Sequence, residues 1–317
     1  MPSPARWPNG ASSAPSCWSP ATAAPCSATP PAALALVGQG RLALDAPITD
    51  WLPDFRPPGP DGAPAAITVR QLLTRTAGLG YRFLESDGQG PLARAGVSDG
   101  LDASGITLAQ NLRRLAGVPL LFALGTAWSY SLATDVLGGV IEAAAGAPLP
   151  QAVARLVTGP LGLRDTAFHA LDAARLAVPY VNDAPGPHRL AEGETVSPYE
   201  ELVGVRYSPS RALDPAAFPS GSHGMVGSAG DVLRLLEALR AGGAPLLPTA
   251  LVDEMGRNQT GAWGRPTRRA PASAWAFRCC ATRPPPARPN RPAPGARAAP
   301  TATAGSWTVP GRSPWSR

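Results

Sequence analysis

The segment Gly125–Leu149, GTAWSYSLATDVLGGVIEAAAGAPL, carries the strongest structural signal of the chain. Residues 131–145 predict a helix, because its large apolar residues recur at helical spacing on one side. These residues are Leu132, Val136, Leu137, Val140 and Ile141. Tyr130 stands directly before this helix. An aromatic residue in that position is either a half-buried packing residue or part of a site.

Further segments on both sides also show helical spacing. They are residues 31–44 ending at Gly40, residues 68–76 capped by Thr68, residues 107–116, residues 149–157, residues 231–240 and a helix that begins at residues 251–255. Residues 80–105 read as loop and residues 170–220 as irregular. The middle of the chain therefore predicts a largely helical body with ordinary amphipathic patterning.

Composition divides the chain into three parts. All 22 acidic residues lie between Asp45 and Glu254, whereas residues 258–317 carry ten Arg and no acid. Residues 1–40 and 265–317 together hold 19 of the 39 prolines. Such segments bury too little apolar surface to fold alone. We predict an irregular, non-native flank over residues 1–30, a folded domain over residues 31–264 and a disordered Pro/Arg-rich tail over residues 265–317.

The chain contains no lysine: its 28 basic residues are all arginines. A guanidinium group stays protonated at any working pH, so it cannot accept a proton from a hydroxyl. Chemistry that needs a side-chain amine as the base is therefore excluded for this sequence.

Five segments, in order, resemble the serine β-lactamase-like superfamily of penicillin-binding-protein-type hydrolases, class C β-lactamases and related esterases. They are ALALVGQGRLALDAPITDWLPDF, ITVRQLLTRTAGL, GTAWSYSLATDVLGGVIEAAAGAPL, GPLGLRDTAF and GMVGSAGDVLRLLEALRAGGAPLL, spread over residues 33–262. The resemblance implies an α+β fold of the β-lactamase/transpeptidase type, with a central antiparallel sheet from the chain ends and a helical domain from the middle. Since the ends are the unusual part here, we expect an incomplete sheet and exposed apolar faces on the helices from residue 131 onward.

The resemblance also implies an acyl-enzyme mechanism. In this family a Ser-x-x-Lys pair at the start of a buried helix supplies the nucleophile and its base, and the Tyr of a Tyr-x-Asn motif acts with the lysine in proton transfer. The second motif aligns with Tyr130-Ser131-Leu132. Tyr130 is therefore the candidate catalytic residue, and Ser131 and Leu132 are candidate substrate-binding residues. Leu132 replaces the motif's Asn, which favours an esterase-like member over a penicillinase.

The first motif is missing. Counting back from Gly40 puts its Ser near Ala23 and its Lys near Cys26, and neither position holds the required residue. No segment after residue 262 matches the third motif, which lines the oxyanion hole in this family. We assign no nucleophile. The sequence predicts a β-lactamase-related serine hydrolase of esters or β-lactam-like amides that is inactive, or nearly so, in this chain.

Both flanks have the composition of a GC-rich gene read out of frame: mostly Ala, Pro, Arg, Gly and Ser, with stray Cys and Trp. Shifted by one base, codons for Thr301–Thr308 can spell Tyr-Gly-His-Ser-Trp-Phe-Val-Asp, a segment expected near the third-motif strand. We interpret both termini as frameshifted and the chain as truncated relative to its family.

Other candidate residues carry weaker signals. His223 lies in the flexible loop Gly221-Ser222-His223-Gly224 and is a further candidate for substrate binding, although a lone His is weak evidence. Ser222 and Ser228 lack a Gly-x-Ser-x-Gly elbow, so neither is assigned as a nucleophile. Ser228 fits a helix N-cap better, because it precedes the helix at residues 231–240.

The sequence implies no metal and no organic cofactor. His169 and His188 lie in predicted loops without ligand spacing, and there is no His-Glu-x-x-His or phosphate-binding glycine loop. The expected partner is a small-molecule ester or amide, and no specific nucleic acid. Two alternatives stay open: a non-catalytic, ligand-binding pseudoenzyme, and nonspecific polyanion binding through the basic tail. Neither a secretory signal nor a membrane span is readable, so the default expectation is the cytoplasm.

Overall fold

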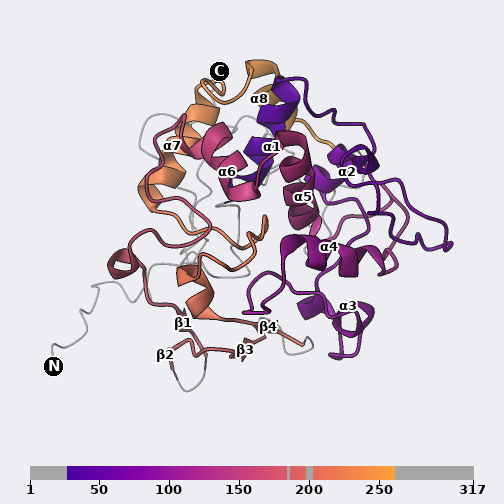
Figure 1. The fold of residues 1–317 in the computed structure, drawn as a ribbon, viewed down its shortest axis with the longest axis vertical. Helices are drawn as coiled ribbons and strands as arrows, with labels where there is room; N and C mark the ends of the chain where they lie inside the picture. The colour runs from indigo at the N-terminus through magenta and orange to yellow at the C-terminus, as the bar shows by residue number, and fades with distance from the viewer. Residues whose placement is uncertain (1–26, 184–185, 198–202, 261–317) are drawn as a thin grey trace, which may run out of the picture.

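The computed structural model describes residues 27–183, 186–197 and 203–260 (Figure 1). The predictions for residues 1–26 and for the tail, including the frameshifts, lie outside these ranges. The helices are α1 (Thr29–Gly38), α2 (Val69–Thr74), α3 (Pro91–Arg94), α4 (Leu108–Ala116), α5 (Ala133–Ala145), α6 (Leu149–Val153), α7 (Ala229–Arg240) and α8 (Thr249–Gly256). Short 3₁₀ helices are η1 (Ile48–Asp50), η2 (Arg82–Leu84), η4 (Ala173–Arg175) and η5 (Pro209–Leu213), and the π-helical segment η3 (Ala154–Thr158) continues α6.

Capping explains why two helices begin where the sequence predicts. Thr68 accepts a hydrogen bond from the backbone N–H of Gln71 at 3.2 Å, and the Gln71 side chain accepts one from the Thr68 N–H at 3.0 Å. Thr107 and Gln110 repeat this reciprocal pair at the start of α4. Such a reciprocal pair is called a capping box, and it satisfies two backbone N–H donors that a helix otherwise leaves without a partner.

The predicted helix over residues 31–44 is wrong at both ends. It begins at Thr29, with Pro30 and Pro31 in its first turn, where a missing N–H does no harm. It ends at Gly38, because Gly40 adopts φ +70° and the N–H of Arg41 turns back to the carbonyl of Leu36 at 2.9 Å. The predicted loop over residues 80–105 contains η2 and the short helix α3.

Helix α5 is the centre of the core. It contacts α1, α2, α4 and α6, and its residues Val136, Val140 and Ile141 have no exposed surface. The close approach to α4 depends on Gly139, since a Cβ there would lie 2.5 Å from Leu112 Cδ1. The expectation of an exposed apolar face is therefore wrong for α5.

The expectation holds for α7. Its side chains Leu233 and Leu236 are 58% and 40% exposed. Leu235 and Leu239, on the other side of the helix, are buried. Helix α7 therefore buries one apolar side and leaves part of another open to solvent.

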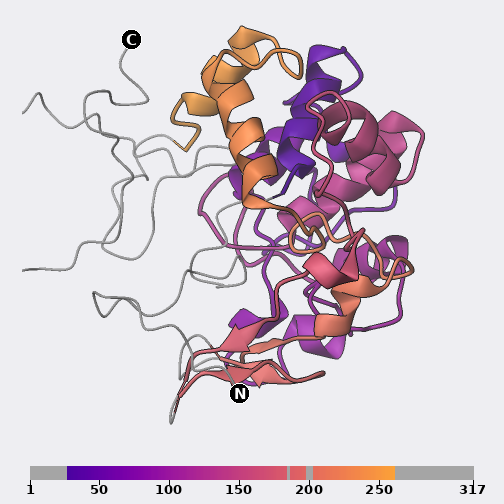
Figure 2. The same ribbon diagram turned by 90° about the vertical axis from the view of Figure 1, so that its left-hand side faces the viewer.

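Four short strands form two antiparallel pairs within the region predicted as irregular. They are β1 (Tyr180–Val181) with β2 (His188–Arg189), and β3 (Thr195–Val196) with β4 (Val205–Arg206). Figures 1 and 2 place these strands together at the end of the molecule opposite α8. Helices with small antiparallel sheets agree with the predicted α+β class, while the predicted central sheet would involve chain ends beyond the described ranges.

His188 is exposed but lies in a strand, not in the loop that the sequence predicts. It lies in β2, with Nδ1 3.1 Å from Asp183 Oδ1 and Nε2 2.7 Å from Glu194 Oε1. Hydrogen bonding to Glu194 and the charges of both carboxylates raise the pKa of His188. The residue therefore ties the two strand pairs together.

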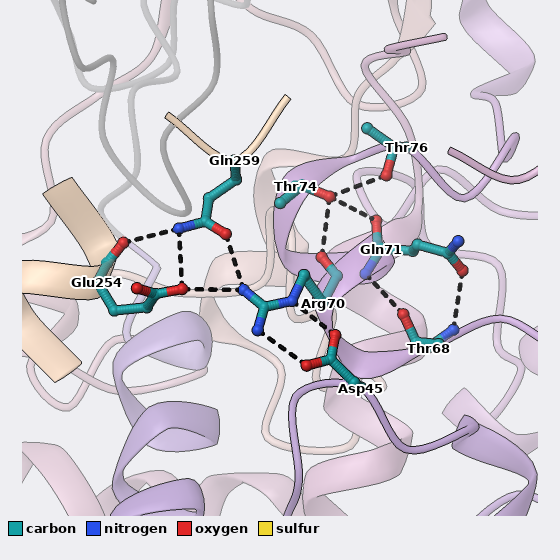
Figure 3. A network of polar contacts seen from close by, with 8 residues as sticks. All are labelled: Asp45, Thr68, Arg70, Gln71, Thr74, Thr76, Glu254 and Gln259. Atoms are coloured by element: carbon teal, nitrogen blue, oxygen red, sulfur yellow. Dashed lines mark hydrogen bonds and ion pairs between the residues drawn. The ribbon is translucent and has the colours of Figure 1, made fainter. Parts of the chain in front are cut away.

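Arg70 of α2 joins both ends of the described chain (Figure 3). Its guanidinium group binds Asp45 through two hydrogen bonds of 2.7 and 3.0 Å. It also donates to Glu254 of α8 at 3.0 Å and to Gln259 at 2.8 Å. Asp45 is exposed and ion-paired.

No single helix of the described ranges has both the length and the apolar composition needed to cross a membrane. Ala133–Ala145 together with Leu149–Thr158 meets the criteria only as a pair, and the pair is bent by 77°.

Candidate active site

Tyr130 lies at the end of the loop that leads into α5. On one side of it, the N–H of Ser129 donates to the carbonyl of Arg75 at 3.1 Å. On the other side, the N–H of Leu132 donates to the carbonyl of Gly80 at 3.2 Å. The loop is therefore fastened to the segment that follows α2, and this fixes where the Tyr130 ring stands.

The structure brings Tyr130 and His223 together across 93 residues of sequence. The phenol oxygen of Tyr130 lies 3.0 Å from Nε2 of His223. The other ring nitrogen, Nδ1, lies 3.2 Å from the backbone carbonyl oxygen of Asp99. The backbone N–H of His223 donates to Ser220 Oγ at 3.1 Å. Both nitrogens of the ring are thus in hydrogen-bond contact, and the ring is held in one orientation.

The turn that carries His223 rests on the start of α1 and on α5. The carbonyl of Gly221 accepts hydrogen bonds from Ser27 Oγ at 2.6 Å and from Thr29 Oγ1 at 3.1 Å. A Cβ at Gly221 would lie only 2.3 Å from the Thr134 carbonyl oxygen, so glycine is required there. The start of α1 thereby positions the Tyr130–His223 pair indirectly.

Aromatic rings surround this pair. Tyr81, which is fully buried, stacks on Phe83 with ring centroids 4.7 Å apart. Its ring also lies 4.8 Å from that of Tyr130 and 5.3 Å from that of His223, centroid to centroid. The packed rings cover the inner side of the pair.

Arg75 places a positive charge beside Tyr130. Its Cζ lies 4.8 Å from the centroid of the Tyr130 ring, and its guanidinium group donates to the Ser131 carbonyl at 3.2 Å and to Thr134 Oγ1 at 3.4 Å. Arg75 is also the one described residue other than glycine with a left-handed backbone, at φ 59°. This conformation ends α2, because the backbone N–H of Arg75 turns back to the carbonyl of Leu72 at 3.2 Å.

Asp135 lies beneath the site, on α5, with no exposed surface. Burial raises the pKa of its carboxyl group, whereas the hydroxyls of Ser220 and Ser222 and the charge of Arg211 act in the opposite direction. Within the described ranges, neither carboxylate oxygen reaches hydrogen-bond geometry with a partner. A buried carboxylate beside two serines of the His223 turn supports that turn electrostatically.

The Tyr130–His223 pair is electrically neutral at neutral pH. Burial lowers the pKa of His223 to about 4, against the favourable effect of the Asp99 carbonyl. Burial also raises the pKa of Tyr130, although the charge of Arg75 opposes the change. An imidazole that stays neutral beside a phenol that stays protonated can share a hydrogen bond but has little tendency to transfer the proton.

Ser131 and Leu132, the predicted substrate-binding residues, are 1% and 0% exposed. The backbone carbonyl of Ser131 accepts a hydrogen bond from Arg75, and the side chain of Leu132 packs into the core. Their role toward a substrate stays a prediction, and it would have to act through the backbone.

Sequence reasoning missed Tyr81 and three charged residues of the site. Asp99 and Arg75 contribute through a backbone carbonyl and a left-handed turn, which leave no signal in a single sequence. Asp135 did leave one: it is an acid directly beside the apolar residues that predict the buried side of the helix, and Asp is seldom fully buried.

The described residues offer no activated nucleophile. Ser27 Oγ donates to a carbonyl, and Ser228 caps α7 by accepting from the Asp231 N–H at 3.2 Å, as the sequence predicts. Ser222 Oγ is buried without a hydrogen-bond partner in the described ranges. The positions near Ala23 and Cys26 fall outside them. No cluster of three or more His, Cys, Asp or Glu side chains suited to a metal ion occurs in the part of the chain that the structure describes.

Comparison with known proteins identifies the family to which the chain belongs. The family model described as Beta-lactamase matches residues 31–279. Esterase EstB of Burkholderia gladioli is 49% identical over 247 residues, which cover 78% of this chain and 62% of that protein. A lovastatin esterase of Penicillium rubens is 26% identical over 75% of this chain and 59% of its own.

Solved structures agree with these relatives. The structure of EstCE1, described as a hydrolase with promiscuous acyltransferase activity, superposes with a TM-score of 0.70 at 43% identity. The match covers 73% of this chain and 61% of that one, so the chain spans about three-fifths of the length of such relatives. A D-stereospecific amidohydrolase from Streptomyces gives a TM-score of 0.51 at 26% identity, over 72% of this chain and 62% of that one. The chain therefore belongs to the beta-lactamase family, within the serine β-lactamase and penicillin-binding-protein-type esterase superfamily.

Proposed function

We propose that this chain carries part of an esterase site, the proton-transfer side with Tyr130, and that it hydrolyses small esters no faster than background. The contact of Tyr130 with His223 is the observation that carries the first half. It supports a site at the position where the family has its proton-transfer tyrosine, and the similarity to Esterase EstB supports an ester as the ligand class.

The second half rests on proton chemistry. A serine hydroxyl attacks an ester slowly unless a base removes its proton, and in this family the base is a lysine. The sequence contains no lysine. Arg75, the cation beside Tyr130, cannot take the role because it stays protonated. Neutral His223 is a weak base in its buried position, since its pKa is lowered to about 4.

The test is turnover combined with labelling. Purified protein is assayed with p-nitrophenyl acetate and nitrocefin, beside Esterase EstB as the positive control, and is then exposed to a fluorophosphonate probe. We expect rates equal to those of the Tyr130→Phe variant and no stoichiometric adduct by intact mass. A pre-steady-state burst, or one probe per chain that is lost in Tyr130→Phe, would show an active acyl-enzyme and refute the proposed inactivity.

A further inference from the structure

We propose that His223 is a positioning residue that fixes the phenolic proton of Tyr130, so that Tyr130 presents oxygen lone pairs to a ligand. In this arrangement His223 Nδ1–H donates to the Asp99 carbonyl, and Nε2 accepts from the Tyr130 hydroxyl. The inference deepens the proposed function, because it defines what the same site can recognise: a hydrogen-bond donor such as an alcohol, in preference to a carbonyl oxygen.

The direction of both hydrogen bonds follows from the contacts. A backbone carbonyl can only accept, so the 3.2 Å contact with Asp99 requires a proton on Nδ1. A neutral imidazole carries one proton, which leaves a lone pair on Nε2. The phenol of Tyr130, 3.0 Å away, must then be the donor. A ligand meets only the remaining lone pairs of the phenol oxygen.

The Asp99 carbonyl is held rigidly, which makes the tautomer a fixed property of the fold. The Asp99 carboxylate accepts hydrogen bonds from the backbone N–H groups of Arg82 at 2.8 Å and Phe83 at 3.2 Å. The preceding residue, Ser98, is bound through its N–H and its carbonyl to the buried side chain of Asn111, both at 2.9 Å. The carbonyl therefore cannot rotate away without breaking buried contacts.

Burial lowers the pKa of His223 most, and nearby cations add to this effect. Arg75, after α2, and Arg211, in η5, both disfavour a positive charge on the ring. The Asp99 carboxylate is directed toward the backbone of η2, and no salt bridge joins any described acid to His223. Asp135 of α5 faces Ser220 and Ser222 of the same turn. The ring of Tyr81 lies 5.3 Å from that of His223, and the Tyr81 hydroxyl lowers the pKa of Tyr130.

Nitrogen NMR tests the assignment directly, because the chain has only three histidines. In ¹⁵N-histidine-labelled protein at pH 7.5, we expect His223 to show a protonated Nδ1 and an unprotonated, hydrogen-bond-accepting Nε2. Tyr130→Phe removes the donor to the neutral ring and should raise the titration midpoint of His223 by about half to one pH unit. Tyr180→Phe, at an exposed tyrosine in β1, is the matched control and should leave the midpoint unchanged.

A His223 ring protonated on Nε2, or a midpoint that does not move in Tyr130→Phe, would overturn the inference. The wild-type tautomer alone decides the matter if Tyr130→Phe fails to fold. The NMR measurement does not depend on turnover, so the proposed inactivity and the proposed role of His223 can be refuted independently of each other. Ester hydrolysis above background with the expected tautomer would refute only the proposed inactivity, and the wrong tautomer in an inactive protein would refute only this inference.

Discussion

His223 makes the protein sensitive to mild acid. Its pKa is about 4 in the folded chain and 6.5 when unperturbed, so between these values the unfolded chain holds a proton that the folded chain lacks. The stability that depends on neutral His223 is complete above pH 6.5 and is lost as pH falls toward 4. Linkage puts this loss at about 2 kcal/mol by pH 4.5, allowing for the partial exposure of the ring.

The measurement compares urea unfolding of wild type and His223→Gln between pH 7.5 and 4.5. A comparison is needed because burial raises the pKa of Asp99 to about 7, and that acid gains stability over much the same pH range, with opposite sign. We expect the stability difference between the two proteins to shift by about 2 kcal/mol against wild type on acidification. A difference that stays constant with pH would contradict the neutral, part-buried state of His223.

Arg75 combines backbone strain with side-chain contacts, and two substitutions separate them. Arg75→Ala removes the contacts to Ser131, Thr134 and the Tyr130 ring but keeps a side chain at φ 59°. Arg75→Gly removes the same contacts and also the strain. We expect both variants to be destabilised in urea, with the glycine variant more stable than the alanine variant by about 0.5–1 kcal/mol. Equal losses would show that the left-handed backbone carries no strain.

At the level of elements, the turn that holds His223 depends on Gly221. Gly221→Ala would place a Cβ 2.3 Å from the Thr134 carbonyl oxygen, and neither backbone can move without disturbing α5. We expect a loss of about 1–3 kcal/mol in unfolding free energy and an altered His223 NMR signal. Gly230→Ala in α7 is the control: its Cβ would meet nothing closer than 3.9 Å, so stability should stay within about 0.5 kcal/mol. Similar effects of the two substitutions would refute the steric argument.

The helices could be predicted where local chemistry decides them. Thr68, Thr107 and Ser228 cap helices as their sequence context indicates, and the periodicity of α5 matches its burial. The strands at residues 180–206 could not be predicted, because two-residue pairs leave no alternating pattern. Tyr130 was found through resemblance. Its contact with His223 was not, since periodicity carries no information on side chains 93 positions apart.

For the whole molecule, the site is assembled from segments that are distant in sequence. The start of α1 holds the Gly221 turn, the residues after α2 supply Arg75 and Tyr81, and the loop around Asp99 orients His223. Helices α1 and α2, which lead to two of these segments, pack on α5. Local damage to any of them should therefore appear at the Tyr130–His223 pair, and the geometry of the pair reports on the integrity of the whole domain.

Arg70 links the two ends of the described chain, so its loss should loosen α8 first. Arg70→Gln would break the ion pairs to Asp45 and Glu254, whose side chains are 74% and 22% exposed (Figure 3). Because solvent screens these charges, we expect a loss of only about 1 kcal/mol in the global free energy of unfolding.

Hydrogen exchange should show a larger and selective loss of protection in the α8 amides, because this helix lies at the edge of the described fold. Arg240→Gln, which breaks an exposed pair with Glu237 within α7, is the control and should change stability by less than about 0.5 kcal/mol. Unchanged α8 protection in Arg70→Gln would mean that packing alone, and not this network, holds α8 against the body.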